Sequence, residues 1–299
     1  MTSPQSIHLP SFRRRLTRWF FVLRPFLVNP KARMGLLILW FFVMLAVLAP
    51  VLSPYSPHAT IFSPGASPSW THWLGTTQSG QDILSQMIWG TRQPLEIALG
   101  AGLLTTLIAV GVGISAGLFG AIYDEILMLV TNIFLILPGL VVVIVISSYL
   151  SSANNFMISL VITLTSWPWG ARVLRAQTLN LKSKDFVKAA TVAGETRFRL
   201  AFFEVLPNMT SLVASNFFFT CLYAVVTAAS LQFLGLGNIN TVSWGSILYW
   251  ANNSQALMIG AWWWFVPPGL AIGLLGAAFA LINFGIDELT NPRLRREAR

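Results

Sequence analysis

The sequence is poor in the residue types on which several classes of protein chemistry depend. It has one cysteine, Cys221, and three histidines among 299 residues. A single cysteine excludes a disulfide within the chain, and with so few ligand residues we expect no metal site. The GxxxxGK[ST] phosphate-binding motif is missing, so the chain does not bind ATP by that route. We therefore expect no catalytic residue and no cofactor in this chain.

Charge is also scarce, whereas apolar residues are abundant. Charged residues make up 10% of the chain, hydrophobic residues make up 55%, and the mean hydropathy is +0.67. A helix needs about 20 apolar residues to cross a bilayer. Such runs predict an all-α polytopic membrane protein with six transmembrane helices, at about 35–53, 97–122, 126–149, 155–171, 208–236 and 256–286. No small-residue cleavage site follows the first run, so we expect a retained span.

The positive charges fall in three segments that six crossings would place on one side. Seven Lys or Arg precede the first run, seven lie between Arg172 and Arg199, and four follow Pro292. The positive-inside rule makes that side the cytoplasm and accounts for the net charge of +9 without a nucleic-acid partner. The expected order is a basic amphipathic N-terminal segment (1–34), a first span (35–53), an extracytoplasmic segment (54–94), a core domain with five spans (95–290) and a basic cytoplasmic tail (291–299).

Two further patterns bear on the kind of membrane protein. Gly113 to Gly117 reads GISAG, which matches the GxSxG nucleophile pattern, but the three histidines lie outside the expected spans and supply no base. Small residues there favour close helix packing instead. The spans also lack interior carboxylates, which argues against an ion-coupled carrier. A self-sufficient carrier or channel nevertheless remains an alternative to an ATP-driven transporter.

The basic loop at 180–207 contains a short helix with a small face. Ser183 can cap this helix, and Asp185 suits its first turn. Ala189 and Ala190 keep one face bare. Gly194 is a natural left-handed stop. These residues, Lys188, and Leu206-Pro207 at the start of the next apolar run resemble the EAA loop of ABC importer permeases, which is the socket for the ATPase. Lys188 stands where that family usually has Glu, and Glu204 where an apolar residue or His is usual.

The outer segment carries a second resemblance, to permeases of the dipeptide, oligopeptide and nickel importer subfamily. That subfamily has a signature reading roughly LGTDxxGRDxxSRxxxGxRxSL. Matching residues are Leu74, Gly75, Thr76, Gly80, Asp82, Ser85, Gly90, Arg92 and Leu95, whereas Thr77, Gln81, Gln86 and Pro94 depart from it. The stretches LQFLGLG, Ser243-Trp244-Gly245 and INFGIDELTNPR also fit, so the resemblance runs from about His72 to Arg293. We expect Gly75, Thr76, Gly80, Asp82, Gly90, Arg92, Trp244 and Gly245 to lie on the side of the binding protein.

The resemblance implies a type I ABC importer permease fold and a C-type subunit in the prokaryotic plasma (inner) membrane. Its partners would be a second homologous permease, two cytoplasmic ATPase subunits that use ATP and Mg²⁺, and an extracytoplasmic binding protein. The implied solute is an oligopeptide or dipeptide; an oligosaccharide of the cello-oligosaccharide type, or nickel, remains an alternative. Trp167 and Trp169 flank Pro168 in a potential bend and are candidates for lining the translocation path, although a structural bend or an aromatic belt also explains them.

Overall fold

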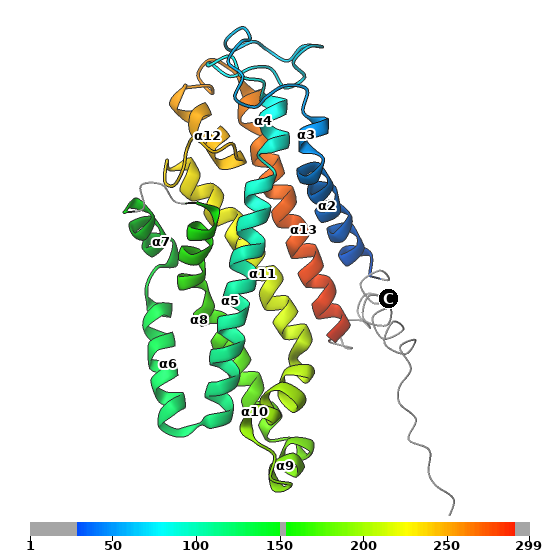
Figure 1. The fold of residues 1–299 in the computed structure, drawn as a ribbon, viewed down its shortest axis with the longest axis vertical. Coiled ribbons are helices and arrows are strands. Elements are labelled where there is room, and N and C mark those ends of the chain that lie inside the picture. The colour runs from blue at the N-terminus through cyan, green and yellow to red at the C-terminus, as the bar shows by residue number, and fades with distance from the viewer. Residues whose placement is uncertain (1–28, 150–153, 291–299) are drawn as a thin grey trace, which may run out of the picture.

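Every named secondary-structure element among the described residues is a helix, which confirms the all-α prediction. This computed structural model describes residues 29–149 and 154–290, so residues 1–28 of the expected amphipathic segment at 1–34 and the whole tail at 291–299 lie outside the described residues. Long helices run side by side along the molecule (Figure 1). They are α2 (Pro30–Val47), α5 (Arg92–Phe119), α8 (Asn155–Lys182), α11 (Thr210–Phe233) and α13 (Val266–Thr290).

Most of the shorter elements gather at the two ends of this bundle, whereas α6 and α7 lie along its side (Figure 1). We call the end with α4 and α12 the upper end and the end with α9 and α10 the lower end. The remaining elements are α3 (Ala49–Leu52), α4 (Ile83–Trp89), α6 (Ala121–Ile136), α7 (Gly139–Ser148), α9 (Asp185–Val192), α10 (Arg197–Arg199), the π-helix η1 (Leu200–Val205), the 3-10 helices η2 (Leu206–Met209) and η3 (Trp262–Trp264), and α12 (Trp244–Asn253).

The expected count of six spans is not confirmed. Among the described residues, four helical stretches are long and apolar enough to cross a membrane, or five if the bent pair α6 and α7 counts as one span. The four are Pro30–Val47, Ile83–Phe119, Arg197–Phe233 and Trp262–Ile286. The expected span at 155–171 lies in α8, which is 28 residues long but polar in its second half, from Trp167-Pro168-Trp169 to Lys182.

The expected single span at 126–149 is broken by a proline. Helices α6 and α7 meet at an angle of 81°. Pro138 has no N–H to donate, and it disfavours the helical conformation at Leu137, which is extended at φ −71° and ψ 131°. The first span also begins earlier than expected, because the Asn29 side chain accepts from the N–H groups of Lys31 and Ala32 and Pro30 occupies the first helical turn.

Helices α5 and α8 pack closely through small residues. A Cβ at Gly113 would lie 2.7 Å from the carbonyl oxygen of Ala171, and a Cβ at Gly117 would lie 2.6 Å from Cγ2 of Thr178. The packing role expected for the small residues at 113–117 is therefore confirmed. Because glycine has no side chain, the backbones of α5 and α8 can approach closely at these positions, as in other membrane helix pairs.

Polar contacts fasten the lower half of α8 to its neighbours. Arg175 on α8 makes two hydrogen bonds of 2.5 Å to the carboxylate of Asp124, in the first turn of α6. Lys182 donates from Nζ to the carbonyl of Leu118 at 3.0 Å, near the end of α5. A cation is favourable there because the last carbonyls of a helix lack N–H partners and carry a partial negative charge.

Helices α2 and α13 pair in a similar way at the edge of the bundle. A Cβ at Gly35 would lie 2.7 Å from the carbonyl oxygen of Ala278. At the lower end, Lys31 and Asn29 both donate to the carboxylate of Glu288. These hydrogen bonds hold the pKa of Glu288 below its usual range. The start of α2 and the end of α13 therefore lie together.

The contact between α5 and α8 makes a prediction about stability. Gly113→Val inserts a side chain where the α8 backbone lies and should destabilise the folded protein by about 1–3 kcal/mol. Gly111→Val is the matched control, because a Cβ at Gly111 meets nothing within 4 Å. Thermal denaturation of the two purified variants in detergent measures the difference. Equal midpoints would show that the α5–α8 approach does not limit stability.

Candidate functional site

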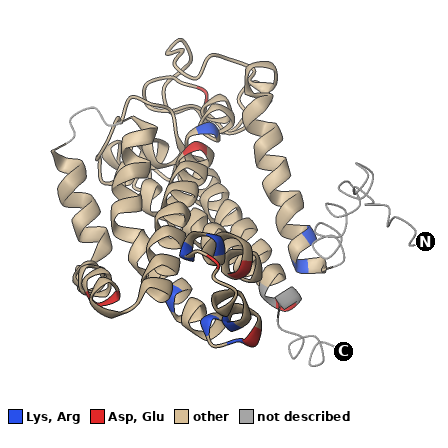
Figure 2. Ribbon diagram, turned by 60° about the horizontal axis from the view of Figure 1, so that its bottom comes forward, with Lys and Arg blue, Asp and Glu red and all other residues tan. Residues whose placement is uncertain are grey.

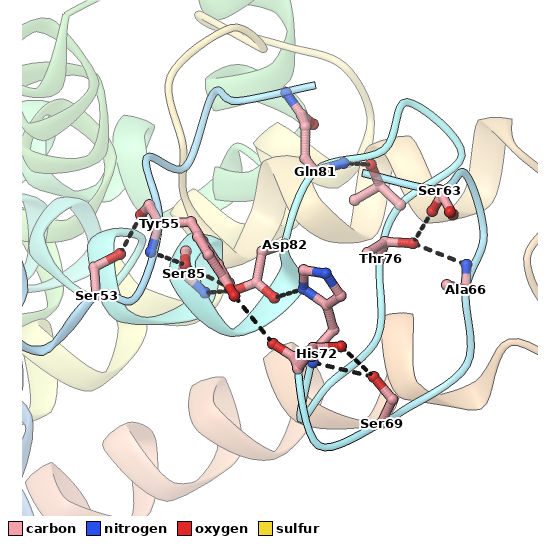
Figure 3. A network of polar contacts seen from close by, with 12 residues as sticks. Ser53, Tyr55, Ser63, Ala66, Ser69, His72, Thr76, Gln81, Asp82 and Ser85 are labelled. Carbon is pink, nitrogen blue, oxygen red and sulfur yellow. Dashed lines mark hydrogen bonds and ion pairs between the residues drawn. The ribbon is translucent and has the colours of Figure 1, made fainter. Parts of the chain in front are cut away.

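Asp82 organises the irregular segment at the upper end (Figure 3). Its side chain is 1% exposed. One carboxylate oxygen, Oδ2, accepts from the backbone N–H of Ser85 at 2.8 Å and from its hydroxyl at 2.7 Å. The other oxygen lies 2.8 Å from Nδ1 of His72. Asp82 therefore caps α4 and, through His72, ties it to a loop ten residues earlier in the chain.

Aromatic rings enclose this contact. The His72 ring lies 4.5 Å from the ring centre of Phe62 and 5.4 Å from that of Tyr55. The backbone N–H of Tyr55 donates to the Ser85 hydroxyl at 3.2 Å, so the start of the segment joins the same network (Figure 3). Sequence reasoning missed Tyr55 and Phe62, since neither falls in a recognised motif.

Three other residues of the signature hold the backbone of this segment. The Thr76 hydroxyl donates to the carbonyl of Ser63 at 2.6 Å and accepts from the N–H of Ala66 at 2.8 Å (Figure 3). Gly75 and Gly80 have positive φ angles of 67° and 70°. A Cβ at Gly75 would lie 2.5 Å from the Ala66 carbonyl oxygen, so glycine is required there. These residues shape the loop, and their role toward a binding protein stays a prediction.

The other residues expected on the side of the binding protein connect α4 and the start of α5 to neighbouring elements. Arg92 donates from Nε to the carbonyl of Ala46 at 2.8 Å and lies 4.5 Å from the ring centre of Trp89. Trp244 is 1% exposed and donates from Nε1 to the carbonyl of Met87 at 3.1 Å. Gly90 and Gly245 allow close approach: a Cβ would lie 3.2 Å from Ser243 in the first case and 2.5 Å from the Gln232 amide oxygen in the second. Their role toward a binding protein stays a prediction.

The outer segment and the loop before α12 together enclose a cavity of about 230 Å³. Apart from His58, its polar side chains are hydroxyls, amides and the two tryptophans Trp250 and Trp264. They include Thr77, Ser79, Gln81, Gln86, Asn240, Thr241, Ser246, Trp250 and Ser254. Thr77 and Gln81, which depart from the subfamily signature, thus lie in a neutral polar lining.

At the lower end, α9 has the start and stop that its sequence predicts, with one correction. Asp185 lies in its first turn, but Lys184 rather than Ser183 occupies the N-cap, and no side chain caps the helix. Gly194 has a φ of 83°. The N–H of Glu195 donates to the carbonyl of Ala190 at 3.2 Å, and that of Gly194 donates to Thr191 at 3.1 Å. This is a Schellman ending, which needs a left-handed residue after the helix.

One side chain holds α9 to the bundle and the opposite face is open. Val187 is 1% exposed, and α9 contacts α8 and η1. Ala189 is exposed, Val192 is 89% exposed, and Ala190 is half-buried. Lys188 lies 3.9 Å from Asp185 on the surface. Figure 2, with the lower end turned forward, shows that most charged residues of the described chain gather at this end.

Leu206 and Pro207 lie where the helical geometry changes. The chain passes from the π-helix η1 (Leu200–Val205) to the 3-10 helix η2 (Leu206–Met209) and then into α11. Pro207 has no N–H for an intrahelical bond, which interrupts a regular α-helix at this point. The interruption sets α11 off from the segment that carries α9 and α10.

The two tryptophans around Pro168 point in different directions. Trp167 is 9% exposed and its ring lies 5.7 Å from that of Phe134 on α6, so it belongs to the core. Trp169 is 51% exposed and stacks on Phe219 of α11, with ring centres 5.2 Å apart. Only Trp169 therefore lies on an open surface of this chain.

Comparisons with known proteins identify the family. Residues 109–296 match the model of the binding-protein-dependent transport system inner membrane component, and residues 17–67 match that of the N-terminal TM domain of oligopeptide transport permease C. The chain belongs to the former family of multi-pass inner membrane permeases, which are not enzymes and in which partner subunits use the ATP. This outcome confirms the family to which the loop at 180–207 and the outer segment pointed.

Individual relatives match over nearly their full length. The dipeptide transport system permease protein DppC of Bacillus subtilis (strain 168) is 32% identical, over 90% of this chain and 83% of its own. The oligopeptide transport system permease protein OppC of the same strain is 31% identical, over 95% and 92%. DppC of Haemophilus influenzae (strain ATCC 51907 / DSM 11121 / KW20 / Rd) is 32% identical, over 93% and 94%.

The network around Asp82 predicts a local effect. Asp82→Ala removes the cap of α4, at a cost of about 1 kcal/mol, and leaves His72 without its carboxylate. Residues 54–82 should then exchange amide hydrogens faster and become more sensitive to protease, while the helix content stays unchanged. Ser79→Ala is the control, because Ser79 is exposed in the same segment. Unchanged exchange in the Asp82 variant would show that the network does not hold this segment.

Proposed function

We propose that this chain is the C-type permease subunit of an ATP-driven importer and forms half of the path for dipeptides or oligopeptides. The peptide solute is supported by relatives that are named for dipeptide and oligopeptide transport. None of these names supports an oligosaccharide as the solute. The observation that carries the coupling role is α9, a short helix that projects from the lower end with an open face of small residues (Figure 1).

The lower end is cytoplasmic in this proposal. The basic residues between Arg172 and Arg199 lie on the lower half of α8 and on α9 and α10, and the positive-inside rule places such segments in the cytoplasm. The start of α2 and the end of α13 meet at the same end, through Asn29, Lys31 and Glu288. Both termini are then cytoplasmic, and the segment at 54–94 faces the binding protein.

The exposed face of α9 suits a groove on an ATPase subunit. Alanine at position 189 and glycine after the helix let another backbone approach closely, and Val192 adds apolar area that is 89% exposed in this chain. Each of two ATPase subunits, with ATP and Mg²⁺, would engage one permease. Lipid and a second, homologous permease would surround the remaining surfaces. Closure of the ATPases would then move α9 and, through it, the bundle between inward- and outward-facing states.

Contacts within this chain give that movement a route. The N–H of Lys184 donates to the carbonyl of Leu181 at 3.0 Å, so α9 follows the end of α8 directly. α8 is fastened to α5 and α6 through Lys182 and Arg175. A displacement of α9 would therefore move α8 with it, and the missing N–H at Pro207 makes the passage into α11 easier to bend.

The docking proposal is tested on the exposed face of α9. Ala189→Arg adds volume and a charge where a packed contact is proposed, which costs about 1–3 kcal/mol and weakens binding by about tenfold or more. We expect loss of ATPase co-purification with normal membrane insertion. Asn180→Arg adds the same group at an exposed position of α8 and should retain the ATPase. Normal retention and uptake in the Ala189 variant would exclude α9 as the docking element.

The function itself is tested by reconstitution. The chain is placed in liposomes with the second permease and the ATPases, with the binding protein outside, and uptake of labelled trialanine and cellotriose is measured with and without ATP. We expect trialanine uptake that needs ATP and every subunit, and no cellotriose uptake. Uptake by this chain without ATP or partner subunits would show a self-sufficient carrier. Uptake of cellotriose but not of trialanine would overturn the proposal that the solute is a peptide.

A further inference from the structure

A stacked aromatic pair bridges α8 and α11 about halfway along the bundle. The rings of Trp169 and Phe219 lie 5.2 Å apart at 29° to each other. They are nevertheless 51% and 43% exposed, so the pair lies on an open face of this chain rather than in its core. The core already has its own aromatic contacts, such as that of Trp167 with Phe134.

Two cavities lie along this face, and the stacked pair belongs to both. Trp169, Phe219 and Asn216 line each of them. α8 runs from the upper to the lower end, and α11 runs back (Figure 1). The cavity of about 140 Å³ with Thr165, Ser166, Thr220 and Tyr223 is therefore on the upper side of the pair. The cavity of about 230 Å³ with Val173, Leu174, Leu212, Ser215 and Asn283 is on the lower side.

The polar groups of both cavities are hydroxyls and amides. Among the described residues that line them there is no Asp, Glu, Lys, Arg or His. The amide oxygen of Asn283 is buried and has no hydrogen-bond partner, so it can accept from a donor that enters the lower cavity. Uncharged groups that both donate and accept, such as the amides of a peptide backbone, match this lining.

Two residues next to Trp169 affect how α8 packs and bends: Gly170 allows close packing, and Pro168 weakens the helix. A Cβ at Gly170 would lie 3.1 Å from Cβ of Ala109 and closer still to the Asn216 side chain, so glycine lets α8 approach its neighbours beside Trp169. Pro168 lies inside α8 and has no N–H to give to the carbonyl of Leu164. The helix is thus weakest in hydrogen bonds at the turn next to Trp169, where a bend requires the least energy.

We propose that Trp169 and Phe219 form a gate in the solute path, between two cavities that bind the uncharged backbone of a passing peptide. This proposal rests on the proposed function as a permease. With the rings stacked, the pair separates the upper cavity from the lower one. A bend of α8 at Pro168 separates the rings, and the apolar ring faces then contact the solute while Asn216 and Asn283 meet its amides.

The gate is tested by leakage from vesicles. Liposomes with the complete importer are loaded with labelled trialanine, ATP is omitted, and its escape is followed. Phe219→Ala and Trp169→Ala each remove one ring and should speed escape about three- to tenfold, the range expected when one aromatic pair is lost. Phe219→Tyr keeps the stack and should stay tight. Leu164→Ala is the matched control, since Leu164 is 43% exposed on the same helix but lines neither cavity.

ATP-driven uptake in the same vesicles separates the two proposals. ATP-driven uptake by the importer with the unmodified chain supports the permease function. If that importer shows no uptake, both the permease function and the gate are overturned. If the unmodified chain shows uptake, the gate is supported by faster leakage in the ring-deleted variants Trp169→Ala and Phe219→Ala together with unchanged leakage in Phe219→Tyr and Leu164→Ala. Leakage and uptake equal to those of the unmodified chain in both ring-deleted variants would overturn the gate and leave the permease function intact.

Discussion

The close approach of α5 and α8 at Gly113 and Gly117 is the constraint on which the other features depend. Lipid is as apolar as the helix surfaces, so helices in a membrane associate through contact and polar bonds rather than through burial from water. Two glycines supply the contact, and Arg175 and Lys182 add bonds to Asp124 and the end of α5. Because α8 continues directly into α9, the same packing fixes where α9 projects.

The two ends of the molecule are connected through α5. At the upper end, Asp82 caps α4, and Gly90 and Arg92 lead from α4 into α5. At the lower end, the last carbonyls of α5 accept from Lys182 on α8. The side chains at the two ends differ in chemistry: apart from His58, uncharged side chains line the cavity between the outer segment and the loop before α12, whereas most charges of the described residues lie at the lower end (Figure 2). That asymmetry is what a protein with a different partner on each side of a membrane requires.

Sequence reasoning succeeded where backbone geometry limits the residue type. The left-handed glycine after α9, Asp185 in its first turn and the small residues of α5 all follow from local sterics or electrostatics, and the structure has them as expected. It failed where contacts far apart in the sequence decide. Asp82 was expected on the side of the binding protein, and nothing in its motif indicated that it is buried against His72. Trp167 was grouped with Trp169 as a candidate for the path, but it is buried against Phe134. Hydropathy alone also missed the break at Pro138 between α6 and α7.

The central claim is that α9 is the part of this chain that meets the ATPase. Amide hydrogen exchange measures this directly, in the detergent-solubilised permease pair with and without bound ATPase subunits. The account predicts that residues 185–194 become strongly protected when the ATPases bind, while α12 at the upper end is unchanged. Equal exchange of residues 185–194 in the two samples, with the ATPases shown to be bound, would contradict it.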